Sequence, residues 1–245
     1  MKLKNFDFIQ KVYLHPEHVV KLKNNERPFP MTIEVDLTNH CNHNCSFCCW
    51  KEDIAVDKST LDTKTIKKTI YEMKKLGAKA ICFTGGGEPM IHKDFYQILS
   101  FTNEKELDCG LITNGSAITK EHCAELINNL QWIRISISGG DAASYNKVQG
   151  KEHFERVISN ISMLAKEKIK KTNSFKIGIR MLLNEMNLYS LSKLAERIKN
   201  INGINYLQIS PNQFANDEGK FWNGPDVENE INKTKKILKM SDIEM

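Results

Sequence analysis

The sequence contains no uninterrupted apolar run near the roughly 18 residues that a membrane span needs. Its first residues, MKLKNFDFIQ, carry charges and lack the apolar segment of a secretory signal peptide. No internal repeat or low-complexity tract is present. We therefore expect an ordinary globular protein that stays in the cytoplasm, without a membrane partner.

Aromatic residues are also scarce, at 8% of the 245 residues, and the net charge is only +5. The sequence has no aromatic array or basic stripe of the kind that stacks on bases and tracks a phosphate backbone, so a nucleic-acid partner is not expected. Its densest basic segment, KEKIKKTNSFK at 166–176, is typical of a solvated helix end. Nothing in the sequence specifies an oligomeric state.

A disulfide framework is not expected either. The chain has seven cysteines, an odd number, and no export signal. Three of the seven lie close together on one segment, which makes ligation of a metal or a cluster the better interpretation.

Short apolar runs alternate with amphipathic stretches along most of the chain, a pattern typical of parallel strands joined by crossover helices. Six strands are predicted, and six are too few to close the usual eight-stranded barrel. The expected fold is α/β: an open, partial (β/α)6 TIM-type barrel with its site at the carboxyl ends of the strands. The predicted strands are Thr32–Leu37, Ala80–Thr84, Cys109–Thr113, Trp132–Ser138, Phe175–Leu183 and Asn205–Ser210.

Helices are predicted between these strands from apolar residues spaced three and four apart. Residues 66–76, 95–99, 123–130, 154–164, 188–198 and 227–238 show this spacing. Residues 1–31, with three prolines, are predicted to form a leader packed across the barrel, and residues 32–245 to form one core domain.

Directly after the first predicted strand the chain reads CNHNCSFC, which places Cys41, Cys45 and Cys48 on one loop. A 4Fe-4S cluster usually takes four cysteines, so three thiolates would leave one iron open to a small molecule. A structural zinc site is the alternative and would recruit Cys49, His40 or His43 as a fourth ligand. Zinc pairs usually come as two distant CxxC units, and the second unit is absent, which favours the cluster.

The second strand runs into Gly85-Gly86-Gly87-Glu88-Pro89. Glycines permit positive φ and close approach of the backbone to a ligand. A tight turn would explain them equally well, but a carboxylate at the end of a strand can also accept a hydrogen bond from an ammonium group.

The CxxxCx-aromatic-C loop after the first strand, followed by GGGEP after the second, resembles the radical S-adenosylmethionine (SAM) superfamily. The resemblance extends from about Thr32 to the last helix. It implies a 4Fe-4S cluster on the three cysteines, with SAM chelating the open iron through its amino and carboxylate groups. One electron from the cluster would cleave SAM to methionine and a 5′-deoxyadenosyl radical, which takes a hydrogen atom from a substrate.

The resemblance also implies a SAM pocket. Phe47 would lie near the adenine or simply pack under the loop, and Gly85 to Pro89 would bind the methionine amino group. Ser136 and Ser138, on the fourth strand, would meet the ribose or carboxylate of SAM. Arg180 would bind that carboxylate or pair with a barrel carboxylate, and Asn114 is a further pocket residue.

The substrate is not specified by the sequence. Relatives modify peptides, sugars or nucleosides through oxidoreductase, epimerase or lyase-type chemistry, and a reductant such as flavodoxin or ferredoxin is an expected partner. The segment 136–150 is similar to members with a cysteine-rich SPASM or twitch domain, and no cysteine follows Cys123 here. A metal-binding scaffold without catalysis is the alternative to an enzyme.

Overall fold

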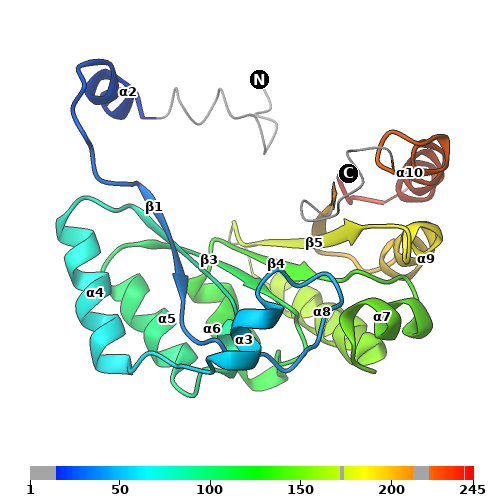
Figure 1. The fold of residues 1–245 in the computed structure, drawn as a ribbon, viewed down its shortest axis with the longest axis horizontal. Helices are drawn as coiled ribbons and strands as arrows, with labels where there is room; N and C mark the ends of the chain where they lie inside the picture. Colours follow the sequence, from blue (N-terminus) through cyan, green and yellow to red (C-terminus); the bar gives the residue numbers. More distant parts are fainter. Residues whose placement is uncertain (1–14, 172–173, 212–220, 240) are drawn as a thin grey trace.

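The computed structural model describes residues 15–171, 174–211, 221–239 and 241–245. Its centre is one sheet of six parallel strands in the order β1-β2-β3-β4-β5-β6, so β1 and β6 are its edges (Figure 1). The strands are β1 (Thr32–Asp36), β2 (Ala80–Thr84), β3 (Asp108–Thr113), β4 (Trp132–Ser136), β5 (Lys176–Leu183) and β6 (Ile204–Pro211). The predicted partial barrel is confirmed.

Helices cover one face of this sheet, below the strands in Figure 1. The α-helices after β1 are α3 (Lys51–Val56), α4 (Thr63–Lys75), α5 (Phe95–Glu104), α6 (Lys120–Asn129), α7 (Ala142–Gln149), α8 (Phe154–Ile169), α9 (Leu191–Ile198) and α10 (Pro225–Leu238). Two 3-10 turns, Pro89–Ile91 and Leu188–Ser190, complete the described elements. No helix in these ranges is both long and apolar enough to span a bilayer.

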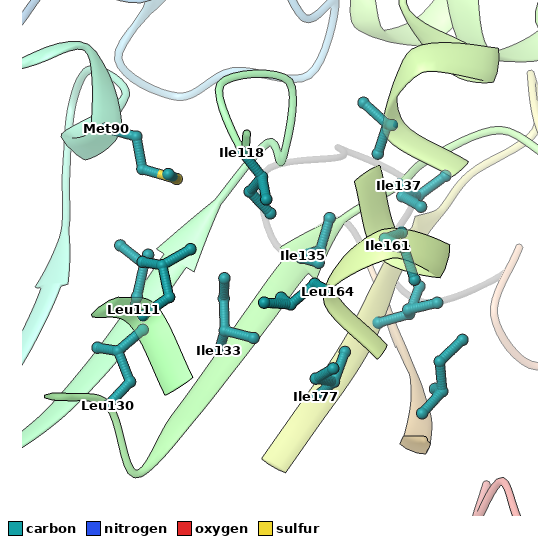
Figure 2. Close-up of a cluster of buried hydrophobic side chains, with 14 of the residues drawn as sticks. Met90, Leu111, Ile118, Leu130, Ile133, Ile135, Ile137, Ile161, Leu164 and Ile177 are labelled. Carbon is teal, nitrogen blue, oxygen red and sulfur yellow. The ribbon is translucent and has the colours of Figure 1, made fainter. Parts of the chain in front are cut away.

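Alternation along the strands separates two chemically different faces. The outward set, which includes Ile133, Ile135 and Ile177, is fully buried against the helices, and Figure 2 shows these side chains facing Ile161 and Leu164 of α8. The opposite, concave face carries the polar residues. The apolar side chains of the outward face pack against the helices. The polar side chains of the concave face stay free of the helices and can contact a ligand.

Three described helices were not predicted: α2 (Pro16–Lys23) in the leader, and α3 and α7, neither of which shows a helical apolar period. In α3 no apolar stripe is present, and α7 buries little beyond Tyr145, Val148 and Gln149. The side chain of Asp141 caps α7 by accepting a hydrogen bond from the Ser144 amide (2.8 Å), and Gly150 ends the helix at φ 66°. Gly150 must be glycine for a second reason: a Cβ there would overlap the Asn44 carbonyl.

The leader is described only from residue 15. Its helix α2 (Pro16–Lys23) buries no residue and lies away from the sheet in Figure 1, although Phe29 packs against the core. The first 14 residues of the predicted leader lie outside the described part of the chain. The division into a leader and a core domain therefore stays a prediction.

Candidate functional site

The cysteine loop joins β1 to α3 at the carboxyl end of the sheet, and α7 holds one side of it. The amides of Asn44 and Ser46 donate to the carbonyls of Gln149 (3.3 Å) and Val148 (2.8 Å). Carbonyls at a helix C-terminus have no partner within the helix. The loop amides supply these partners, and the same hydrogen bonds hold the cysteine loop in place.

The other side of the loop is held by the glycine turn and by β3. The amides of Gly87 and Glu88 donate to the carbonyls of Thr38 (3.1 Å) and His40 (2.7 Å). The Asn114 side chain donates to Asn42 on the loop (2.7 Å). The cysteines are therefore positioned by three separate elements of the barrel.

All seven cysteines are free thiols. Cys41, Cys45 and Cys48 are half-buried, Cys49 is exposed, and the remaining three are buried as the small apolar residues expected of them. The pKa of Cys45 is raised to about 12, chiefly by burial and then by the nearby Cys41 and Cys48.

Within the described ranges, no three His, Cys, Asp or Glu side chains lie close enough together to hold a single metal ion. A cubane cluster differs from a single ion because each thiolate binds its own corner iron, so the sulfurs stay apart. Three half-buried thiols on this one short loop fit such a cluster.

A cavity of about 320 Å³ opens beside the loop. Most of the predicted site residues line it together: Cys41, Cys45, Phe47, Cys48, Gly85, Gly86, Gly87, Glu88, Asn114, Ser136 and Arg180. These residues come from the loop and from the ends of β2, β3, β4 and β5, as expected for a site at the carboxyl edge of a parallel sheet.

Two predicted residues do not line the cavity. Ser138 lies beyond the end of β4, where its hydroxyl accepts a hydrogen bond from the Leu182 amide (3.3 Å) and its amide donates to the Gln149 side chain (2.6 Å). The strand ends two residues earlier than predicted, so its alternation does not extend to Ser138. Pro89 is buried as the first residue of a 3-10 turn.

The three glycines of the turn differ in why a side chain would not fit there. Gly85 has φ 143°, and a Cβ there would meet Asp36 at 2.9 Å, while a Cβ on Gly87 would overlap the Thr38 and His40 carbonyls. At Gly86 the nearest atom would be the Asn39 side-chain oxygen at 3.1 Å. Gly87 therefore has to be glycine for the cysteine loop to pack on the turn, whereas a Cβ at Gly86 would require only a small shift of the Asn39 side chain.

Glu88 is almost completely buried, and its carboxylate is held by the protein itself. It accepts hydrogen bonds from the Thr113 hydroxyl (2.6 Å), the Asn114 amide (2.7 Å) and the Met90 amide (3.1 Å). Burial raises the pKa of Glu88, and the donated hydrogen bonds oppose that rise. The side chain thus ties the glycine turn to β3, a role that its sequence position does not reveal.

We expect Glu88→Ala to lower the free energy of unfolding by about 3 kcal/mol, because three buried donors would lose their acceptor. Glu88→Gln keeps one acceptor oxygen and should lose less. Urea unfolding of the cluster-free protein measures the difference. The exposed Glu104→Ala is the control and should stay within about 0.5 kcal/mol of the parent; an equal loss in both variants would contradict the tie to β3.

Arg180 lies on the concave face, where its Nε donates to the Ser210 hydroxyl (3.1 Å). Burial lowers the pKa of Arg180, and the charge of Arg134 lowers it further. In the described part of the chain, no carboxylate comes within ion-pair distance of Arg180. The alternative of an internal ion pair finds no support there.

Gln149 is the functional residue that sequence reasoning missed. Its side chain accepts from the Ser138 amide and donates to the Ser136 carbonyl (3.3 Å), while its own carbonyl holds the cysteine loop. Gln149 also lines the cavity. The signals that would have placed it are the N-cap Asp141 and the helix-ending Gly150, which bracket α7.

Known proteins match this chain in sequence and in fold. An AdoMet-dependent heme synthase of Methanosarcina barkeri is 29% identical over 179 residues, which are 72% of this chain and 49% of the synthase. A probable GTP 3′,8-cyclase of Pyrococcus abyssi is 30% identical over 140 residues, 56% of this chain and 44% of the cyclase. The chain spans about half the length of the curated relatives it matches.

Among solved structures, Streptococcus suis SuiB bound to S-adenosylmethionine superposes with a TM-score of 0.69 at 17% identity. The superposition covers 100% of this chain and 56% of SuiB, and at this identity it shows a shared fold. The family model described as the radical SAM superfamily matches residues 35–187, which contain the end of β1, the cysteine loop, the glycine turn and β2 to β5. This chain belongs to the radical SAM superfamily.

Proposed function

We propose that this chain holds a 4Fe-4S cluster on Cys41, Cys45 and Cys48 and binds SAM in the adjoining cavity. The observation that carries the proposal is that the three thiols, the glycine turn, Ser136 and Arg180 all line one cavity. When bound, a reduced cluster supplies the electron that splits SAM into methionine and a 5′-deoxyadenosyl radical, which abstracts a hydrogen atom from the substrate.

The residues of the chain would orient SAM in this cavity. The amides of Gly86 and Gly87 are already donated to Asp36 and Thr38, and among the described hydrogen bonds none ends on the carbonyl of either glycine. Those carbonyls are suited to receive the SAM ammonium group, with the Glu88 carboxylate supporting the turn from behind. Arg180 offers a cation to the SAM carboxylate.

The remaining contacts follow from position. Ser136 and Asn114 line the cavity at the ends of β4 and β3 and would meet the ribose, and Phe47 would pack on the adenine. Pro89 and Ser138 would not contact SAM directly. They would instead hold the glycine turn and the end of β4 in position. A reductant such as flavodoxin or ferredoxin would deliver the electron, and a peptide or a small molecule would be the substrate.

Formation of 5′-deoxyadenosine tests the proposal. Anaerobically reconstituted protein, given SAM and dithionite, should release 5′-deoxyadenosine slowly without any substrate, and the true substrate should accelerate the release. Chromatographic quantification with Cys45→Ala as the control should find product only in the parent. If reconstituted, reduced protein bound SAM but gave no product with any candidate substrate, the chain would be a metal-binding scaffold instead.

A further inference from the structure

The concave face carries a second arginine that the proposed SAM site does not use. Arg134 lies on β4 two residues before Ser136 and on the same face of the sheet. It is therefore next to the cavity, one step closer to the amino ends of the strands. Its Nη1 donates to the Gln208 side-chain oxygen on β6 (3.3 Å), across Gly178 of β5. Gln208 is in turn the register partner of Arg180.

Two aromatic rings flank Arg134, and glycines make room for both. A Cβ on Gly110 would overlap the Trp132 ring, and a Cβ on Gly178 would overlap the Tyr206 ring, so each ring lies over a neighbouring strand. The guanidinium carbon of Arg134 is 5.9 Å from the Trp132 ring centroid. On the concave face, Arg134 therefore lies between the rings of Trp132 and Tyr206.

The charge of Arg134 is not compensated. In the described ranges, no carboxylate lies within ion-pair distance of it, and its Nε is buried without a hydrogen-bond partner. Glu34 and Asp36 share the concave face, but both are exposed on the edge strand β1. Another cation, Arg180, lies close enough for the charge of Arg134 to lower its pKa.

Two half-buried arginines side by side are unfavourable unless anions neutralise them. SAM has one carboxylate, and Arg180 is the residue nearest its proposed place. A second anion is therefore required to explain Arg134. We propose that Arg134, oriented by Gln208, binds an anionic group of the substrate, a carboxylate or a phosphate, next to SAM. This inference rests on the proposed function and names the chemical class of its substrate.

Calorimetric titration with inorganic pyrophosphate and, separately, with glutarate tests the site and distinguishes the two anion classes. At low ionic strength the reconstituted, SAM-saturated protein should bind at least one probe saturably. Arg134→Gln should weaken that binding at least tenfold while iron content and SAM affinity stay at the parent values. Arg197→Gln, which removes an exposed arginine paired with Glu155 on the outer surface, should leave probe binding unchanged.

Gln208→Glu provides a second variant in case Arg134→Gln fails to fold. It places a carboxylate of the same size beside Arg134, so the site would be filled from within; we expect probe binding to fall at least tenfold without loss of thermal stability. Binding by neither probe, or parent-like affinity in both variants, would overturn the anion site. Calorimetry reports binding of the probe and does not depend on SAM cleavage, so this result can fail while the proposed function stands, and the reverse.

Discussion

Replacing any one of Cys41, Cys45 and Cys48 with alanine should abolish stable cluster binding, whereas Cys49→Ala should retain about four irons and four sulfides per chain. With three protein ligands already leaving one iron open, two would leave half the cluster without protein ligands. Cys49 provides the matched control because it lies next to Cys48 and is exposed. Cys49 lies outside the CxxxCx-aromatic-C motif, so it should not substitute for its neighbour.

Iron and sulfide analysis after anaerobic reconstitution measures this effect, and the visible absorption of the cluster reports it independently. Parent-like iron content in Cys45→Ala would show that the ligand assignment is wrong. Loss of the cluster in Cys49→Ala alone would point to a different ligand set, such as the four-ligand zinc-type site that the sequence also allowed.

Adding one methyl group at Gly87 should disrupt the cluster, while the same change at Gly86 should affect only SAM. A Cβ on Gly87 would overlap the carbonyls of Thr38 and His40, so the cysteine loop must move away from the turn. At Gly86, which lines the SAM cavity, the methyl group meets the movable Asn39 side chain at 3.1 Å and the Trp50 side chain at 3.8 Å. The two substitutions are chemically identical and separated by one residue.

We expect Gly87→Ala to lose most of its iron after reconstitution, and to unfold at a lower urea concentration than the parent. Gly86→Ala should keep its iron and bind SAM about tenfold more weakly, with Gly86→Val weaker again, because the added carbons would press on Asn39 and Trp50 and shift the turn whose carbonyls receive the SAM ammonium group. Normal iron content in Gly87→Ala, or unchanged SAM affinity in Gly86→Val, would contradict these separate roles.

The arrangement of the barrel could be predicted from sequence because its strands are short apolar runs with helices between them. The helices α3 and α7 could not, since neither has an apolar face with helical spacing. The missed α7 mattered most, because its last carbonyls fix the cysteine loop. That contact joins residues about 100 positions apart and depends on how α7 is placed against the sheet.

Individual residues of the site show the same limit. The resemblance placed both Ser136 and Ser138 in the SAM pocket. Ser136 lines the cavity, but Ser138 does not, because β4 ends before that residue. The sequence indicated that Glu88 ends a strand, but its three partners lie partly on β3, so their identity depends on sheet register. Arg134 drew no functional prediction, because its lack of a carboxylate partner is a property of the folded sheet.

The central claim is that three cysteines leave the cluster one iron to which SAM binds directly in the cavity beside the glycine turn. Electron paramagnetic resonance of the one-electron-reduced protein, recorded without and with SAM, tests it most directly. We expect a 4Fe-4S signal whose g values shift when SAM is added, with the shift lost or requiring far more SAM in Gly86→Val. A reduced 4Fe-4S signal that stays the same at saturating SAM would contradict it.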